Sequence, residues 1–551
     1  MTAPHFGISA KGDILCSGRD EVPLANFSFD TVRPLYDPVH PSILSGLQVS
    51  VRHPGGCSTI FLDIAVKDLT GQILRKIPVC RLLQSAARPT LDAHLISLVE
   101  KSSTEPKTLY FREHGLCQLE GGHWAYVCGD TVLGMPDSLK YQVADKVARA
   151  HLAWDPELPA IDAVKELCQR LGQYDHILLP VWGFTIFSSL RFCVRQLNLT
   201  TLPSLAIVGG QNLGKTTLAQ RYLLLYDDKH RPGRCWAQLD AHSTAAATIN
   251  QVCLYRDQVV LVDDLARSAS AAERRARLEL IAEVLRFASN DVDRVRMTSK
   301  RLVEERFCQA GLAFTGEFQL DNPSDLTRLV SVELREQLKG GSDDDRRLAA
   351  TAFHHFLLWL LPRLDEEIEK LRWALDAVTT GVDIRLRKNR MVLLWAIHLF
   401  YSFAEDLGAV TEKYFAQALA RAETILNGLL DRQRQSVERV TRPAPAGNLS
   451  WYILRGYRNN AFHVVPRKKI RDSSDCVVEN DALCIRAEAL LQFFHTATPY
   501  HELTKTDMSR RLAGEGVLAQ HKERRAATKK IGGKRYLELH FSNLKAATQA
   551  Y

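Results

Sequence analysis

One short stretch of the chain combines glycine, lysine and threonine at a spacing that suits phosphate binding. Residues 209–216 read Gly-Gly-Gln-Asn-Leu-Gly-Lys-Thr, after the apolar run 204–208 and before a helix-favouring run that opens with Thr217. Glycines at both ends of such a loop let backbone N–H groups turn inward around a phosphate. The alternative, a chance glycine-rich turn, does not account for the strand and helix patterns on either side.

This stretch predicts a site for a nucleoside triphosphate. Lys215 would place its charge against the β- and γ-phosphates, and the Thr216 hydroxyl would ligate Mg²⁺. ATP and Mg²⁺ are therefore the expected cofactors. The expected nucleotide-binding residues are Gly209, Gly210, Gln211, Asn212, Leu213, Gly214, Lys215, Thr216 and Thr217.

A pair of carboxylates further along the chain completes this chemistry. The apolar run 259–262 ends in Asp263 and Asp264. A run without polar residues is typical of a parallel strand buried on both faces, and ligands bind at the carboxyl ends of such strands. We expect Asp263 to hold Mg²⁺ together with Thr216, and Asp264 to polarise the attacking water.

Composition narrows the class of protein. The chain has 551 residues, of which 46% are hydrophobic, which is enough for several domains with real cores. Its twelve cysteines are scattered without a C-x-x-C pair, as expected in a reducing cytosol. No signal-peptide pattern is seen, and the apolar stretch 177–190 is too short to span a bilayer and predicts a buried helix. We expect a cytoplasmic protein with no membrane partner.

Positive charge is unevenly distributed. The net charge is +8, and all of the excess lies in residues 441–551. A basic terminal module on a nearly neutral remainder predicts a polyanionic partner.

Hydrophobic periodicity and turn residues divide the chain into five parts. Strands and helices alternate after residue 201, which predicts a parallel sheet with helices on both faces. The expected core strands are 204–208, 235–239, 258–262, 311–315 and 328–334, with a long helix at 271–288. The parts are a β-rich N-terminal domain at 1–145 with one helix near 91–101, a helical linker at 146–200, the α/β core at 201–340, a helical lid at 341–440 and, after the linker 441–447, a basic domain at 450–551.

Four residues of the first part could be taken for a zinc site: His114, Cys117, His123 and Cys128. They flank the turn 119–122 and would form a hairpin. Residues three or five apart on a strand point to opposite faces, so these four side chains cannot easily converge on one metal ion.

Two polar residues follow the carboxylates in an order that resembles AAA+ ATPases. The strand 311–315 ends in Thr315, which matches the sensor-1 position of that family, and Arg328 stands where an arginine finger occurs. The resemblance implies that Thr315 touches the γ-phosphate or its water, and that Arg328 reaches the nucleotide of a neighbouring subunit. An ordinary strand end and a solvated surface arginine are the alternatives.

A cationic run before the sensor strand resembles the pre-sensor-1 hairpin of MCM and viral superfamily-3 helicases, which lines a hexamer pore. Phosphate contacts need charge without base readout, which lysine and arginine supply. A solvated loop is the alternative. The residues that the resemblance assigns to DNA are Arg294, Arg296, Lys300 and Arg301.

Taken together, the stretch 209–216, the run 243–248, the Arg294 segment and the run 314–317 resemble the MCM-like AAA+ ATPases of bacterial mobile elements, such as staphylococcal cassettes. Residues 111–116 with 129–130 resemble the N-terminal module of the same family. Two features depart from it. Asp264 stands where the family usually has Glu, and the loop 210–213 contains fewer Ser and Thr residues.

The basic C-terminal part predicts a winged helix. Helices are expected at 486–495 and 504–512, the second with Thr504 as N-cap, and strands at 517–519 and 536–541 around a basic loop. Such a wing would lie on the phosphate backbone, and a merely solvated hairpin is the alternative. The expected DNA contacts are Arg510, Arg511, Lys522, Arg524, Arg525, Lys529 and Lys530, with Lys534 and Arg535 beside them.

These features predict an ATP-dependent, DNA-translocating AAA+ helicase, working as a homo-oligomer, a hexameric ring, in the replication of a mobile element. One alternative is an ATP-dependent switch or DNA loader that never unwinds. Another is a defence NTPase whose basic domain senses nucleic acid. The cations at Lys300 and Arg301 favour the helicase, because a switch has no need of them.

Overall fold

The computed structural model divides the chain into two compact units. One comprises residues 1–265, 283–317 and 327–433, and the other residues 266–282, 318–326 and 434–551. The described residues are 5–8, 14–17, 22–64, 68–84, 87–101, 107–197, 202–231, 233–240, 244–265, 271–289, 294–297, 303–306, 308–317, 320, 322–338, 344–378, 384–441, 448–466, 476–479, 481–498, 500, 503–518, 528–531 and 534–549.

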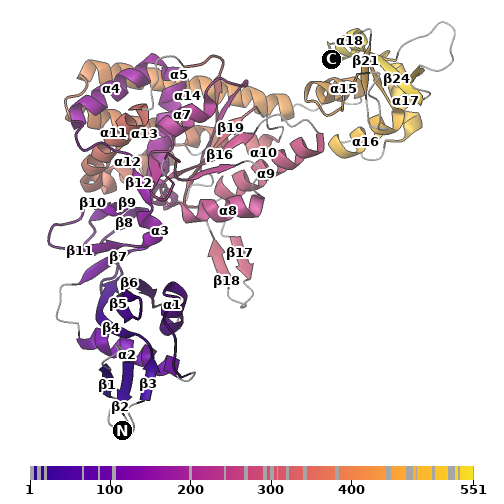
Figure 1. The fold of residues 1–551 in the computed structure, drawn as a ribbon. Helices are drawn as coiled ribbons and strands as arrows, with labels where there is room; N and C mark the ends of the chain where they lie inside the picture. The colour runs from indigo at the N-terminus through magenta and orange to yellow at the C-terminus, as the bar shows by residue number, and fades with distance from the viewer. Residues whose placement is uncertain are drawn as a thin grey trace. The chain divides into compact units, whose positions relative to one another are not determined.

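A five-stranded parallel sheet forms the centre of the first unit, in the order β15-β16-β19-β13-β20. Figure 1 labels β16 and β19 of this sheet. Its strands are β13 (Ser204–Gly209), β15 (Gln238–Asp240), β16 (Val259–Leu265), β19 (Gly311–Gly316) and β20 (Leu329–Leu334). Leu205, Leu261 and Leu312 are completely buried, as expected for a sheet covered on both faces. The predicted mixed α/β core with a parallel sheet is confirmed.

Four of the five predicted core strands match closely, and the second is displaced. The run 235–239 was expected to be extended, but the strand β15 begins only at Gln238. Ala237 has φ +64°, which breaks the extended run, and Cys235 forms only an isolated bridge with Asp227. The helices that lie between these strands in the sequence are α7 (Lys215–Tyr222), α8 (Ala245–Leu254), α9 (Ala271–Ser289) and α10 (Pro323–Leu326).

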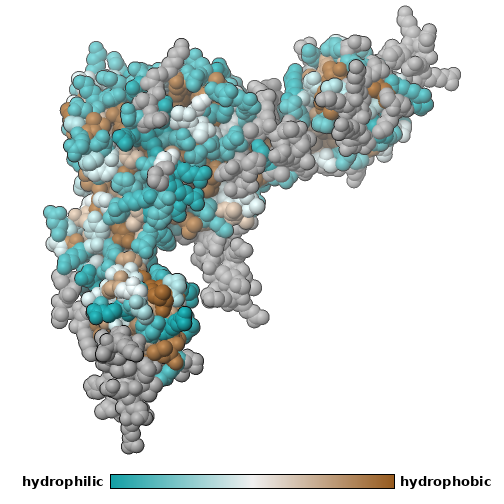
Figure 2. All heavy atoms as spheres, in the orientation of Figure 1, coloured by the Kyte–Doolittle hydropathy of each residue, from teal (hydrophilic) through white to brown (hydrophobic). Residues whose placement is uncertain are grey.

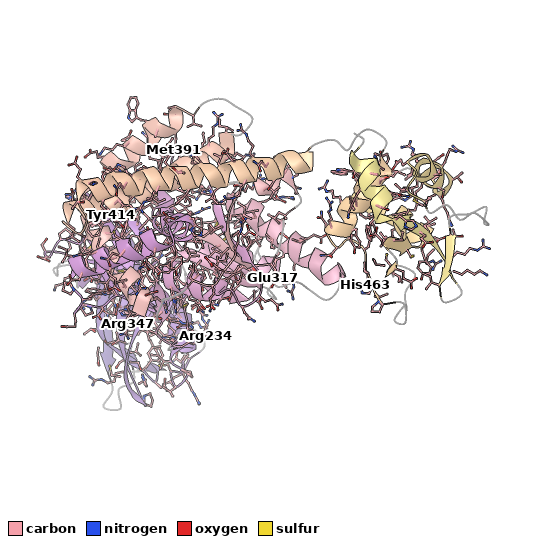
Figure 3. All side chains as sticks on the ribbon, turned by 90° about the horizontal axis from the view of Figure 1, so that it is seen from above. Arg234, Glu317, Arg347, Met391, Tyr414 and His463 are labelled. Carbon is pink, nitrogen blue, oxygen red and sulfur yellow. The ribbon has the colours of Figure 1, made fainter. Side chains whose placement is uncertain are left out.

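The two helical segments that flank the sheet in sequence share one hydrophobic core. The rings of Trp182 and Phe400 lie 5.2 Å apart at 77°, and the Tyr414 hydroxyl donates to the carbonyl of Cys168 at 2.9 Å. Tyr414 is labelled in Figure 3. The predicted linker 146–200 and lid 341–440 therefore pack together. Their helices are α4 (Ala160–Gln173), α5 (Asp175–Ser189), α6 (Arg191–Arg195), α11 (Asp344–Leu360), α12 (Leu364–Asp376), α13 (Ile384–Asp406) and α14 (Glu412–Thr441).

Helix α5 is the buried helix that the apolar stretch 177–190 predicted. It is buried from Ile177 to Ser189 and contains Pro180. Across the described part of the chain, no helix combines the length and the apolar character that a membrane span requires. Figure 2 shows a mainly hydrophilic surface with scattered apolar residues on the visible face.

The N-terminal part is β-rich, as predicted. Its largest sheet has the order β11-β7-β4-β5-β6, and the sheets β1-β2-β3 and β10-β9-β8 accompany it. The hairpin expected around 119–122 is confirmed as β8 and β9. The strands are β1 (His5–Ile8), β2 (Ile14–Ser17), β3 (Val22–Ala25), β4 (Ser28–Tyr36), β5 (Leu44–His53), β6 (Gly56–Asp63), β7 (Thr108–Phe111), β8 (Gly115–Gln118), β9 (Trp124–Cys128), β10 (Thr131–Leu133) and β11 (Lys140–Val143).

Three helices and a pair of short strands are further elements of the first unit. The predicted helix near 91–101 is α2 (Ala87–Lys101), whereas α1 (Leu69–Lys76) was missed. Asp68 caps α1 by accepting a hydrogen bond from the Gly71 N–H at 2.8 Å. After α3 (Asp145–Ala148), the unpredicted strand β12 (Ala150–Leu152) pairs with β14 (Tyr226–Asp228).

The C-terminal part contains a four-stranded antiparallel sheet, β21-β22-β24-β23. The predicted helices are confirmed, and the Thr504 hydroxyl accepts the cap hydrogen bond from the Asp507 N–H at 3.2 Å. Most of the predicted linker, residues 442–447, lies outside the described residues. The elements are α15 (Leu449–Arg458), β21 (Val477–Glu479), β22 (Ala482–Ile485), α16 (Ala487–Ala497), α17 (Lys505–Gly514), β23 (Thr528–Ile531), β24 (Lys534–His540) and α18 (Phe541–Gln549).

One predicted strand of this part is wrong. Its described residues, Val517 and Leu518, contribute only an isolated bridge between Leu518 and Leu539, because Gly516, at φ +69°, and Val517 terminate helix α17. Residue 519 lies outside the described residues. The strands that pair with β24 are instead β22 and β23, and β23 lies within the stretch expected to be a basic loop.

Candidate nucleotide site

The glycine-rich loop connects the end of β13 to the first turn of α7. A Cβ atom on Gly209 would lie 2.5 Å from the carbonyl oxygen of Leu334, so only glycine fits there. Asn212 and Gly214 have φ +60° and +82°, and Gly214 is the N-cap of α7. The loop therefore directs the unpaired N–H groups of a helix N-terminus toward the carboxyl end of the sheet, where an anion is favoured.

Lys215 folds back over the loop that precedes it. Its Nζ donates to the carbonyls of Gly209 at 3.0 Å and Gly210 at 2.6 Å. Two neutral acceptors are weaker partners for an ammonium group than a phosphate is. The lysine is thus held at the loop and can exchange these carbonyls for phosphate oxygens.

Three of the predicted residues meet at one carboxylate oxygen. The Thr216 hydroxyl donates to Asp263 Oδ1 at 2.8 Å, and the Thr315 hydroxyl donates to the same oxygen. These side chains come from α7, β16 and β19. A carboxylate and a hydroxyl oxygen side by side form a hard, oxygen-only donor set, which suits Mg²⁺.

A residue that sequence reasoning missed completes this group. Gln238, at the start of β15, donates from Nε2 to the other oxygen of Asp263, Oδ2, at 2.8 Å. The sequence signal that could have identified it is its place near the carboxyl end of the predicted strand 235–239. Ligands bind at that edge of a parallel sheet.

The strand β16 is irregular where it carries Asp263 and Asp264. The register of β16 against β19 shifts between Val262 and Leu265, and Asp264 has φ +60°. Its N–H donates to the Thr315 hydroxyl at 3.1 Å, and its side chain is exposed. A non-glycine residue in this conformation costs about 1–3 kcal/mol and typically marks a functional position.

Arg328 is buried, with a relative exposure of 6%, just before β20. Its backbone carbonyl accepts a hydrogen bond from the Ser204 N–H at 2.9 Å. In this conformation the side chain faces the interior of its own subunit, so a contact with a neighbouring nucleotide would require it to swing outward.

A cavity of about 140 Å³ adjoins the loop. It is lined by Leu213 and Thr217 and by Tyr174 and Leu338. Its position and mixed lining suit the base and sugar of a nucleotide whose phosphates occupy the loop. Polar residues that also line it are Arg170, Gln173, Arg221, Gln337 and Asp345.

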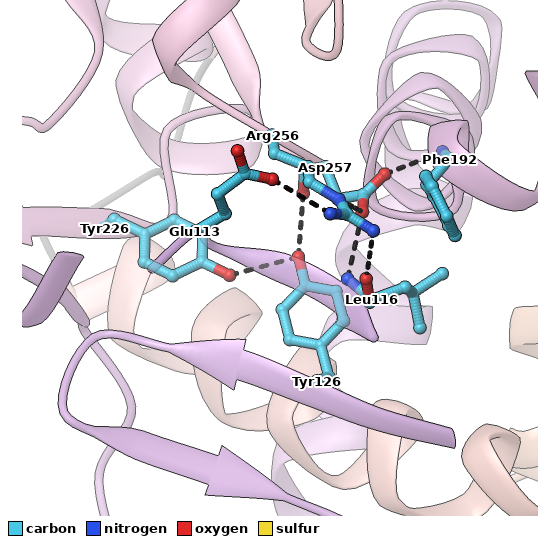
Figure 4. A network of polar contacts seen from close by, with 7 residues as sticks. All are labelled: Glu113, Leu116, Tyr126, Phe192, Tyr226, Arg256 and Asp257. Atoms are coloured by element: carbon cyan, nitrogen blue, oxygen red, sulfur yellow. Dashed lines mark hydrogen bonds and ion pairs between the residues drawn. The ribbon is translucent and has the colours of Figure 1, made fainter. Parts of the chain in front are cut away.

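A buried polar network lies immediately before β16 (Figure 4). Asp257 is completely buried with φ +51° and accepts from the N–H groups of Leu116 at 2.9 Å and Phe192 at 2.8 Å. The Tyr226 hydroxyl donates to that of Tyr126, which in turn donates to the Asp257 carbonyl at 2.7 Å. Burial raises the pKa of Asp257 to about 6, although Arg256 and the two N–H groups act to lower it.

Arg256 connects the same buried network to Glu113, whose side chain is exposed. It forms an ion pair with Glu113 at 3.0 Å, donates to the Leu116 carbonyl and lies 3.9 Å above the Phe192 ring. The β8–β9 hairpin and α6 are therefore fastened to the turn that leads into the Asp263 strand. Sequence reasoning missed this network.

The predicted DNA-contacting segment before β19 forms a hairpin of β17 (Arg294–Met297) and β18 (Val303–Arg306). The strands pair antiparallel, with Arg294 opposite Arg306 and Arg296 opposite Glu304. The predicted contacts at Lys300 and Arg301 lie outside the described residues.

The predicted DNA contacts of the C-terminal part that the structure describes lie on α17 and on the β23–β24 hairpin. Arg510 is exposed and contacts Asp507 Oδ1 at 3.1 Å, and the Arg511 guanidinium lies 5.6 Å from the Tyr500 ring centre. Across the hairpin, Lys529 is paired with Tyr536 and the exposed Lys530 with the exposed Arg535. Lys522, Arg524 and Arg525 lie outside the described residues.

Comparison with known proteins finds likeness in structure alone. No protein-family model and no curated protein matches the chain. A solved structure described as an active helicase, SCCmec type IV Cch, aligns with a TM-score of 0.51 and 14% identity over 98% of both chains. This chain therefore has the fold of that helicase along nearly its whole length.

Two further solved structures align too loosely to carry an argument. One is a JCV helicase bound to a small molecule, with a TM-score of 0.20, 13% identity and coverage of 42% of this chain and 73% of that one. The other is the apo C-terminal region of NrS-1, with a TM-score of 0.25, 11% identity and coverage of 92% and 96%.

Proposed function

We propose that this protein is an ATP-dependent DNA helicase of the AAA+ type that works as a homo-oligomeric ring. The observation that carries the proposal is the meeting of Thr216, Asp263 and Thr315 behind a glycine-rich loop that ends in Lys215. The full-length likeness in fold to a helicase supports it. A hexameric ring and a role in replicating a mobile element follow from the resemblance in sequence.

Each residue of the site has a role in this proposal. Lys215 and the N–H groups of the loop bind the β- and γ-phosphates, while Thr216 and Asp263 hold Mg²⁺. The Mg²⁺ ion would neutralise charge on the phosphates. Asp264 orients and polarises the attacking water, and the exposed position of its side chain leaves it free to do so.

Thr315 connects the two carboxylates, because its hydroxyl donates to Asp263 and accepts from the Asp264 N–H. A change in the phosphates would alter the contacts of the Mg²⁺ held by Asp263. Through the Thr315 hydroxyl, this change would be passed directly to the strand β19. The β17–β18 hairpin immediately precedes this strand, so it is well placed to couple hydrolysis to movement on DNA. The C-terminal domain, proposed to be a winged helix, supplies further backbone contacts through α17 and the β23–β24 hairpin.

The test is hydrolysis of ATP with and without single-stranded DNA, combined with strand displacement on a forked duplex and the mass of the particle in ATP. A helicase shows DNA-stimulated hydrolysis, displacement and a ring-sized mass. Stimulated hydrolysis without displacement would indicate the loader or switch instead. No binding of ATP would overturn the proposal altogether.

A further inference from the structure

The two oxygens of Asp263 have different partners. Oδ1 accepts from the hydroxyls of Thr216 and Thr315, whereas Oδ2 accepts from Gln238 Nε2 at 2.8 Å. The hydroxyls belong to the proposed nucleotide chemistry. Gln238 does not touch the loop, so its part in the site requires a separate explanation.

The pairing of two parallel strands brings Gln238 to this position. Gln238 of β15 is opposite Leu261 of β16, and Asp240 is opposite Asp263. Side chains two residues apart on a strand share a face, so Gln238 and Asp263 project from the same face of the sheet, one step apart. The glutamine side chain is long enough to cover that step.

A second glutamine orients the first. Gln220 follows Thr216 by four residues on α7 and therefore lies on the same side of the helix. Its Nε2 donates to Gln238 Oε1 at 3.1 Å. Helix α7 thus reaches Asp263 twice, directly through Thr216 and indirectly through the two amides.

The direction of this chain of hydrogen bonds follows from the acceptor at its end. An ionised carboxylate only accepts, so Gln238 must present its NH₂ group to Asp263 and its oxygen to Gln220. A carboxylate that is held on one oxygen cannot rotate freely about its Cβ–Cγ bond. Its other oxygen then remains beside the Thr216 hydroxyl.

We infer that Gln238 is a positioning residue that fixes the rotation of Asp263, so that Oδ1 stays beside Thr216 as a ligand for a divalent cation, and that Gln220 acts through Gln238. This inference rests on the proposed nucleotide site. Groups that orient a metal-binding side chain typically change metal affinity 10–100-fold when they are removed.

The experiment compares Gln238→Leu, Gln220→Leu, the double variant and Gln48→Leu in the full chain. Gln48 is the matched control, because it is also a strand glutamine with an amide contact, to Arg33, but lies in β5. Binding of Mn²⁺ to the ADP-loaded protein is followed by electron paramagnetic resonance. Binding of fluorescent ADP in EDTA and the apparent Tm are measured in parallel.

We expect Gln238→Leu to weaken Mn²⁺ binding about tenfold, with ADP binding in EDTA and Tm unchanged. Gln220→Leu should weaken it less. In the double variant Gln220→Leu should add nothing, because its partner is already gone. Gln48→Leu should behave as wild type.

Three results would overturn the inference. They are unchanged Mn²⁺ affinity in Gln238→Leu, additive effects of the two substitutions, and a fall in Tm together with ADP affinity in EDTA, which would make Gln238 a structural residue. Gln220→Leu, on the half-exposed face of a helix, tests the same chain if Gln238→Leu does not fold. Failure of the wild-type protein to bind ADP would instead reject the proposed nucleotide site, and the two failures are therefore distinguishable.

Discussion

Asp257 accepts a hydrogen bond at 2.9 Å from the backbone N–H of Leu116, a residue 141 positions earlier in the chain. Two residues after Asp257 the strand β16 begins, and it carries Asp263. One buried carboxylate therefore connects the β8–β9 hairpin to the strand of Asp263, the proposed metal-binding residue. The loss of this carboxylate should affect the stability of the whole first unit.

We expect Asp257→Ala to destabilise the first unit by about 3–5 kcal/mol, because it leaves two buried N–H groups without their acceptor and removes the carboxylate that lies 3.5 Å from Arg256 Nε. Chemical denaturation of the full chain measures the effect. Asp137→Ala, which removes an exposed carboxylate from the same N-terminal part, is the control and should be neutral. Equal stability of the two variants would show that the network contributes nothing.

The same residue should make stability depend on pH. Burial raises the pKa of Asp257 from 3.8 to about 6, so between these values the folded protein binds a proton that the unfolded chain releases. The contribution is present below about pH 4 and is lost as the pH rises to about 6. The Tm of wild type minus the Tm of Asp257→Asn should therefore fall as the pH rises from about 4 through about 6, and level off above about pH 7. A rise of this signed difference with pH would contradict the prediction.

Lys215→Ala should abolish hydrolysis of ATP, because the loop loses the charge that holds the β- and γ-phosphates. Release of phosphate from ATP measures it. Lys413→Ala, an exposed lysine on α14, should hydrolyse ATP as wild type does. Hydrolysis by Lys215→Ala at the wild-type rate would contradict the proposal that the loop 209–216 is the ATP site.

The neighbouring carboxylates should separate into two phenotypes. Asp264→Asn should bind ATP with Mg²⁺ normally but hydrolyse it at least about 100-fold more slowly, because the water loses its polarising group. Asp263→Asn should lose Mg²⁺-dependent binding. Equilibrium binding beside single-turnover hydrolysis distinguishes them, and the opposite pattern would show that the roles are exchanged.

Lys300→Ala combined with Arg301→Ala should uncouple hydrolysis from DNA. Assembly and basal hydrolysis should survive, since neither residue is expected to touch nucleotide, while DNA-stimulated hydrolysis and strand displacement fall. Strand displacement at the wild-type rate would mean that this segment does not bind DNA during unwinding. The ATP-dependent switch would then be the better interpretation of this protein than the helicase.

The predictable parts of this molecule are those whose signal is local. The apolar runs at 204–208 and 259–262 identify buried parallel strands, and the loop between Gly209 and Thr216 has its own spacing. Gln238 and Asp257 act through contacts with residues far away in sequence, which no local pattern records. Strand β23 (Thr-Lys-Lys-Ile) is predicted as a loop from the sequence, because it lacks the alternation of apolar and polar residues by which strands are recognised.

The common core of α5 and α13 determines the order in which the chain can fold during synthesis. Helix α5 is buried along nearly its whole length, yet its partner α13 begins roughly 200 residues later, which at about 5–20 residues per second takes roughly 10–40 s. During that interval Trp182 and Phe184 leave the ribosome without their partner. The nascent chain therefore presents a chaperone-binding segment until α13 has emerged, and a fragment that stops before α13 should aggregate.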